Sequence, residues 1–312
     1  MRFNNIALAA TAAVSVTAQR PSDTPICDYY TTALLKNNTA ENQLTLLTVL
    51  VNTVVIGNYT EPNVGIKVPG ILAPGKINDT DVNLLPYFDG ELASSNRGGE
   101  MGVAVNFLDG GGAAPLMKNK PADDDSSNQY FLLTHLYQFF GSLLGCSMQG
   151  MSGFDAYTGE ASMYQVHKFM DLDYAEVTYF VTQVGMAAAS FGVAEDDIKI
   201  VATALNSLFN VRCAPATTVI KAQGSELQSI CIAKSCPLAM DGVCSKYDTP
   251  VEPKNATATG SSTATMTSGM TSGTSAETAT GTGGAQATET GAAAAVGLGW
   301  AGIAVGFAAF ML

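Results

Sequence analysis

The chain has 312 residues, of which 47% are hydrophobic and only 13% are charged, and its net charge at pH 7 is −12. Nucleic acids and anionic lipid surfaces are bound by clusters of Lys and Arg, so this acidic, charge-poor chain excludes both as electrostatic partners. The mean hydropathy of +0.18 is high for a folded domain, and much of the apolar excess lies at the two ends of the chain.

Residues 1–18 have the pattern of a secretory signal peptide. Arg2 precedes an apolar run from Ile6 to Val16, and small residues follow at positions 17 and 18. Such a segment is removed during secretion. We therefore expect the mature chain to begin near Gln19, and a buried N-terminal helix is the alternative interpretation.

Two further segments have less distinct patterns. Residues 45–56, TLLTVLVNTVVI, are apolar at nearly every position, which fits either a buried helix or a buried strand. Residues 61–125 are rich in Gly, Pro, Asn and Asp, and we assign them no regular structure. A connection of this length inside a domain is usually functional or disordered.

The segment from 130 to 213 has the periodicity of several helices. Residues 130–144 are apolar almost all round, as in a centrally buried helix. Residues 171–190 place apolar side chains three and four positions apart, and Phe191-Gly192 ends that helix. Acidic residues at 195–197 then open another helix, where they complement the positive end of its dipole. We predict an all-α fold for residues 19–249.

The chain contains 6 cysteines, all between the signal peptide and residue 249. An even number in a secreted chain predicts disulfides, but their pairing cannot be read from the sequence. We expect Cys231, Cys236 and Cys244 to form disulfides that hold a C-terminal loop. Zinc is the competing use, but their spacing fits no usual zinc site. The cysteines are Cys27, Cys146, Cys213, Cys231, Cys236 and Cys244.

The C-terminal region has the composition of a cell-surface tether. Residues 250–283 are mostly Ser, Thr, Gly and Ala and predict a disordered stalk. Residues 284–312 end in an apolar tail with no charged residue after it, which indicates a GPI-attachment signal with Gly283 as the attachment residue. A true transmembrane anchor is the alternative. N-glycosylation sequons occur at Asn37, Asn58, Asn78 and Asn255.

Signal peptide, stalk and tail together resemble fungal GPI-anchored surface proteins. This predicts a location on the extracellular face of the plasma membrane or in the cell wall, with the membrane contacted through the GPI lipid. Cell-wall glucan is a further candidate partner.

Three short elements occur in a fixed order in the helical region. They are FFGSLLG at 139–145, YTG at 157–159 and MYQVHKFM at 163–170, after which a helix ends in GV at 192–193. In this order they resemble the truncated globins, whose proximal histidine lies in the VH pair. The resemblance implies a globin-like core that binds haem, with His167 as the iron ligand.

The same resemblance assigns other residues to the haem pocket. Phe88, in LLPYF at 84–88, would pack on the haem face. Leu132 and Leu136 fall at distal positions, and His135 falls where the family often places a base that meets a haem propionate. Neither leucine has a hydrogen-bond donor, so oxygen bound there would lack its usual hydrogen bonds from that helix.

The distal tyrosine of the family has two candidate counterparts, Val55 and Tyr59, because the N-terminal helices cannot be aligned uniquely. The family's LGG is Leu144-Gly145-Cys146 here, and a long insertion separates Phe88 from the distal helix.

Our leading hypothesis is an extracellular GPI-anchored globin-like protein that binds haem, or a diatomic gas through it, for gas binding, haem handling or redox chemistry. The alternative is a non-enzymatic wall or adhesion protein that keeps the scaffold without haem. Hydrolase, P-loop and dinucleotide-binding motifs are absent from the sequence, so we assign no enzymatic activity.

Overall fold

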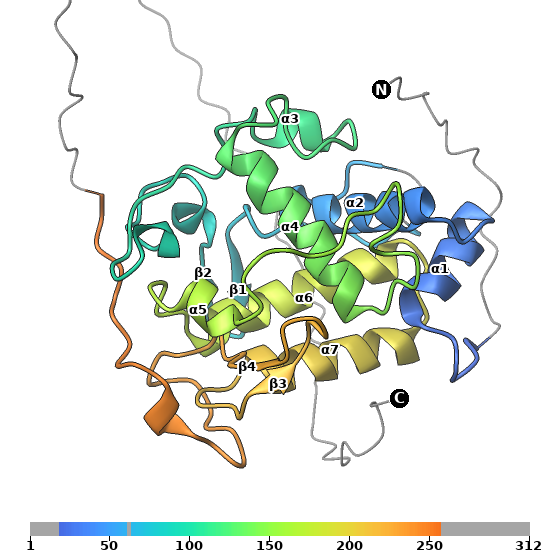
Figure 1. Cartoon of the computed structure of the whole chain (residues 1–312). Coiled ribbons are helices and arrows are strands. Elements are labelled where there is room, and N and C mark those ends of the chain that lie inside the picture. Colours follow the sequence, from blue (N-terminus) through green and yellow to red (C-terminus); the bar gives the residue numbers. More distant parts are fainter. Residues whose placement is uncertain (1–18, 61–63, 257–312) are drawn as a thin grey trace, which may run out of the picture. The chain divides into compact units, whose positions relative to one another are not determined.

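Helices dominate the computed structural model, which describes residues 19–60 and 64–256. These residues all belong to one compact unit (Figure 1). The predicted signal peptide, the anchor with Gly283, and the stalk beyond residue 256 lie outside the described residues. The α-helices are α1 (Ile26–Leu35), α2 (Ala40–Ile56), α3 (Ala113–Leu116), α4 (Asn128–Leu143), α5 (Met163–His167), α6 (Tyr174–Ser190) and α7 (Glu195–Phe209).

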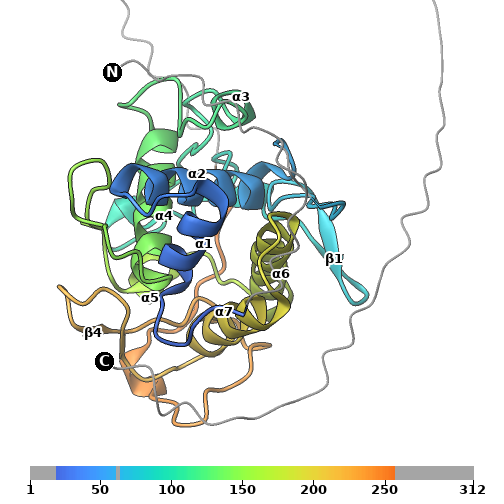
Figure 2. The ribbon, with the colours of Figure 1, turned by 90° about the vertical axis from the view of Figure 1, so that its right-hand side faces the viewer.

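The fold is mostly helical, but it also contains small antiparallel sheets, so the all-α prediction holds only in its coarser form. The remaining elements are β1 (Gly75–Ile77), β2 (Thr80–Val82), β3 (Thr217–Thr218), β4 (Ser225–Glu226), and the 3₁₀ turns η1 (Leu85–Tyr87), η2 (Asn96–Gly98) and η3 (Cys244–Lys246). β1 pairs with β2, and Figure 2 shows this hairpin projecting beside α6. Its turn places Asn78 at φ 52°, a conformation that Asn tolerates better than most residues.

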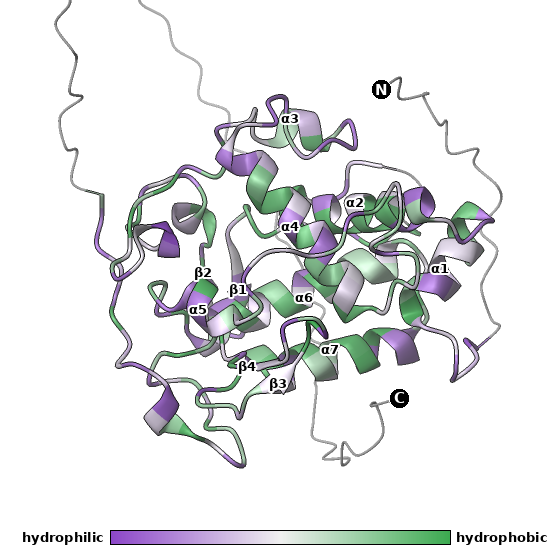
Figure 3. Cartoon of the chain, viewed as in Figure 1, coloured by the Kyte–Doolittle hydropathy of each residue, from purple (hydrophilic) through white to green (hydrophobic). Residues whose placement is uncertain are grey.

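The core forms where α2, α4, α6 and α7 pack together (Figures 1 and 2). α6 contacts α7 most extensively, and α2 contacts both α4 and α6. Leu47 and Leu205 are fully buried there. Along each helix in Figure 3, hydrophilic and hydrophobic residues alternate in patches, as expected for helices with one buried side. No helix in the described part of the chain is both long and apolar enough to span a membrane.

Capping residues define the helix ends. Thr39 accepts a hydrogen bond from the Asn42 amide and starts α2, so the ambiguous 45–56 run lies in a helix of 17 residues. A capping box between Asp173 and Glu176 starts α6. That helix ends at Ser190, just before the predicted glycine stop.

Buried amide side chains hold the long segment between α2 and α4 in place. Asn52 donates to the Leu116 carbonyl oxygen at 3.1 Å. Gln183 accepts from the Gly70 amide at 3.0 Å, and Gln129 bonds both the amide and the carbonyl of Gly112. These groups satisfy loop backbone that would otherwise be buried without partners. The sequence predicted no regular structure in this segment, but it contains β1, β2, η1, η2 and α3.

All six cysteines are paired, which confirms the predicted disulfides. Cys27 bonds Cys146, and so ties α1 to the chain after α4. The other two pairs, Cys213–Cys244 and Cys231–Cys236, hold the C-terminal loop region as expected.

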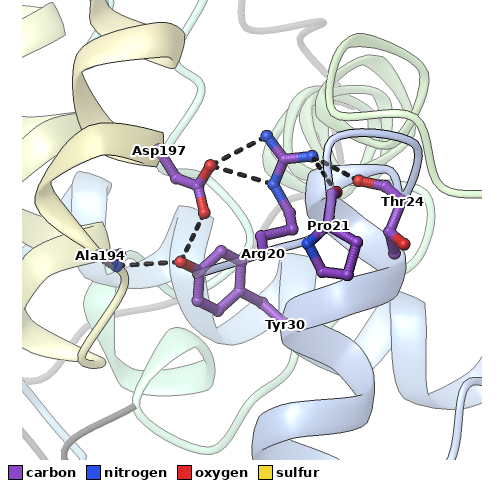
Figure 4. A network of polar contacts seen from close by, with 6 residues as sticks. All are labelled: Arg20, Pro21, Thr24, Tyr30, Ala194 and Asp197. Carbon is purple, nitrogen blue, oxygen red and sulfur yellow. Dashed lines mark hydrogen bonds and ion pairs between the residues drawn. The ribbon is translucent and has the colours of Figure 1, made fainter. Parts of the chain in front are cut away.

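A buried ion pair fixes the start of the described chain to α7 (Figure 4). The Arg20 guanidinium lies 2.9 Å from Asp197 Oδ1, and their side chains are 7% and 8% exposed. Tyr30 donates to the same carboxylate at 2.8 Å and accepts from the Ala194 amide at 2.9 Å. α7 has no side-chain N-cap, but the Tyr30 hydroxyl satisfies the backbone amide of its N-cap residue, Ala194.

Candidate functional site

His167 is the last residue of α5, whose N-cap Ser162 accepts from the Gln165 amide. Its ring nitrogen Nδ1 lies 2.8 Å from the Met163 carbonyl oxygen. A carbonyl oxygen only accepts, so Nδ1 carries the proton and Nε2 keeps its lone pair. The local helix thus selects the tautomer that binds a metal through Nε2.

Burial of the imidazole lowers the pKa of His167, although the hydrogen bond to Met163 acts in the opposite direction. Because burial disfavours the charged ring, His167 is neutral at neutral pH. A neutral imidazole is the form that ligates iron.

The predicted distal residues lie together on α4. Leu132 and Leu136 are half-buried and pack against the core. His135 donates from Nδ1 to the Phe131 carbonyl oxygen at 2.6 Å. Its ring stacks on Phe131 at 4.0 Å between centroids and meets the edge of Tyr157 at 5.8 Å.

Phe88 lies directly after η1 and is half-buried against the same core. Its carbonyl oxygen accepts from the Phe107 amide at 2.7 Å, which holds the start of the long insertion in place. Within the described residues, no hydrogen bond or ring contact joins His167 to Phe88 or His135.

The two candidates for the distal tyrosine differ in their surroundings. Val55 is buried in the core from α2. Tyr59 follows that helix, and its hydroxyl donates to Asn119 Oδ1 at 2.7 Å. The Tyr59 hydroxyl therefore already bonds a residue of the long segment between α2 and α4.

An apolar cavity of about 50 Å³ lies among α1, α2, α4, α6 and α7, and His167 does not line it. A second, polar cleft of about 490 Å³ lies beside the start of α6, and His167 does not line this one either. The tautomer of His167 leaves Nε2 with a lone pair, but neither cavity forms a slot for a porphyrin next to it.

The polar cleft is formed by residues that no sequence pattern singles out. Its carboxylates are Asp171, Asp173, Glu176 and Glu252, and the Tyr87 hydroxyl donates to Glu176 at 3.0 Å. The first three carboxylates lie close together in the sequence, where nothing marks them as a site. Glu252 joins them only through the fold.

The predicted glycosylation sites differ in access. Asn37, Asn78 and Asn255 are exposed. Asn58 is half-buried, and its side-chain oxygen accepts from the Val68 amide.

Comparison with models of protein families, with curated proteins and with solved structures gives no match. Within residues 19–60 and 64–256, no group of three or more His, Cys, Asp or Glu side chains is arranged to hold a metal ion.

Proposed function

We propose that the protein is an extracellular, GPI-anchored, globin-like protein that binds haem through His167. The observation that carries this proposal is the hydrogen bond from His167 Nδ1 to the Met163 carbonyl oxygen, which leaves Nε2 available. A hydrogen bond from the ring nitrogen that does not bind the metal orients metal-binding histidines and raises their basicity.

The order of helices also supports the proposal. The long helix α4 carries Leu132, His135 and Leu136, the short α5 ends in His167, and the packed pair α6 and α7 follows. This is the order that the sequence resemblance implies.

Haem, when bound, would supply an iron centre for binding a diatomic gas or for electron transfer. His167 would hold the iron on one side. Leu132 and Leu136 would shield the other side from water without donating a hydrogen bond. Because His135 Nδ1 donates to the Phe131 carbonyl, Nε2 of the neutral ring only accepts, so His135 would donate to an anionic propionate only as the imidazolium.

Because neither cavity contains His167, binding would require the chain to rearrange, and we place this change in the segment between α4 and α5. Residues 144–162 contain no helix and connect these two elements, so they are the part of the chain that we expect to change.

The first experiment is to purify the secreted protein from cells supplied with haem precursor. Its absorption spectrum and its haem-to-protein ratio are then measured. A Soret band with a ratio near one supports the proposal. A colourless protein that takes up no added hemin contradicts it and favours the adhesion or wall protein.

A further inference from the structure

The helices around the core do not fill all the space between them. α1, α2, α4, α6 and α7 surround the apolar cavity of about 50 Å³. Its inner wall includes Leu47, Val184 and Leu205, which are buried. Leu34 and Val201 also line it but are only half-buried, and we call such half-buried lining residues the rim. Because the rim is partly exposed, the cavity can be reached from the surface.

The cavity offers a water molecule almost no hydrogen-bond partner. Of the described side chains that line it, only Tyr30 carries a hydroxyl, and Figure 4 shows that hydroxyl bonded to Asp197 and to the Ala194 amide. A buried water molecule needs several polar partners, so water is held poorly in this space. An apolar group gains by leaving water for it.

Gly185 keeps the cavity larger than the fold requires. It lies inside α6 and lines the cavity, and its backbone does not have the positive φ that favours glycine. Among the described residues, an added Cβ would meet only Ile198 Cγ2, at 3.5 Å, which is an ordinary contact. Alanine would therefore fit, would favour the helix and would fill part of the space. A ligand that uses this space accounts for the glycine, whereas backbone and packing do not.

α1 forms one wall of the cavity, and covalent and polar bonds fix its position. Cys27 is bonded to Cys146, which follows α4. Tyr30 donates to Asp197 of α7 at 2.8 Å. These bonds oppose a shift of α1 that would close the space.

The size and charge of the site indicate which molecule it takes. The volume of about 50 Å³ is well below the roughly 150 Å³ of a cavity that binds benzene, so the end of an unbranched alkyl chain fits better than a ring. None of the described residues that line the cavity is Lys or Arg, and the chain has a net charge of −12. A carboxylate head group would therefore gain nothing there.

We propose that this cavity binds the unbranched alkyl chain of a neutral, lipid-like molecule, with the chain end among the five helices and the head group at the rim. The rim side chains cover the part of the chain that the cavity does not hold. His167 does not line the cavity, so binding of the chain needs no haem.

Calorimetric titration of the full secreted chain with 1-butanol, 1-hexanol and 1-octanol tests the proposal. Each methylene that leaves water should tighten binding about fourfold. Cyclohexanol should bind more weakly than 1-hexanol, which has the same number of carbons in an open chain. Octanoate should bind more weakly than 1-octanol, because its head group is charged. In NMR spectra, the terminal methyl of 1-octanol should show cross-relaxation with the methyl groups of Val184 and Leu205.

Two variants fill the cavity from different helices. G185A should weaken 1-octanol binding about fourfold, because its methyl takes the space of about one methylene, and should raise Tm. A202L, from α7, should weaken binding more strongly because it adds a larger side chain to the wall. The matched control is T182A, which also favours α6 but lies on its exposed side and should leave binding unchanged.

Four results would each overturn the proposal. They are no binding of any of the alcohols by the wild type, binding of cyclohexanol or octanoate as tight as that of the matching straight-chain alcohol, and wild-type affinity in both G185A and A202L. The fourth is a fall in Tm in G185A, since packing would then require the glycine.

Discussion

Removing the Arg20 guanidinium should destabilise the whole domain. In R20M, the Asp197 carboxylate keeps the Tyr30 hydroxyl but loses the cation that lies 2.9 Å away. Both side chains of the pair are over nine-tenths buried, so the remaining charge cannot be fully hydrated. Breaking a buried pair in this way costs about 3–5 kcal/mol.

Urea unfolding followed by circular dichroism measures this cost, with the disulfides intact. For a domain of this size, about 3–5 kcal/mol corresponds to a fall in Tm of roughly 6–20 °C. The matched control is K199Q, which breaks an exposed pair with Glu195 in the same helix and should change the stability little.

A second variant separates the charge effect from lost packing. R20M/D197N removes the buried charge but keeps an oxygen that accepts from Tyr30. It should regain at least about 1 kcal/mol relative to R20M, since the unpaired charge is gone. A loss below about 1 kcal/mol in R20M, or no recovery in the double variant, would refute the role given to the ion pair.

Three other predictions concern the disulfides, the loop anchors and the chain ends. Replacing Cys27 and Cys146 by Ser, which opens a loop with a sequence separation of 119, should cost about 2–5 kcal/mol in urea unfolding. Q183L leaves the Gly70 amide without its acceptor and should cost about 1–3 kcal/mol, with faster exchange of that amide, whereas T182V at an exposed neighbouring position should change little. Phosphatidylinositol-specific phospholipase C should release the protein from intact cells, with a mature N-terminus near Gln19; mature protein that retains Leu312 would contradict the GPI prediction.

The sequence predicts the helices well where periodicity and caps agree. The predicted helices at 130–144 and 171–190 correspond to α4 (Asn128–Leu143) and α6 (Tyr174–Ser190), and the acidic start at Glu195 is correct. The 45–56 run was ambiguous because its decisive signal, the Thr39 cap, lies outside the apolar stretch.

The structure of residues 64–125 could not be predicted because it depends on hydrogen bonds to residues far away in the sequence. Gln183 and Asn52 bond backbone groups 113 and 64 positions away, and no local pattern reveals such pairs. The disulfide pairing and the presence of Glu252 and Asp171 in one cleft are likewise properties of the folded chain.

For the candidate site, His167 could be proposed as a ligand from the sequence, but its tautomer could not. The hydrogen bond to Met163 arises from the i,i−4 geometry of α5, which could not be assigned as a helix by itself because it has only 5 residues. The absence of His167 from both cavities was also not foreseen.

The most direct test of the central proposal is a hemin titration at pH 7.5, where His167 is neutral, comparing wild type with H167A and H135A. The account predicts one-to-one binding with a sharp Soret band in wild type, loss or a strong shift of that band in H167A, and only modestly weaker binding in H135A. Circular dichroism should show the same helix content in all three proteins. Equal binding by wild type and H167A, or no stoichiometric binding by the folded wild type, would contradict it.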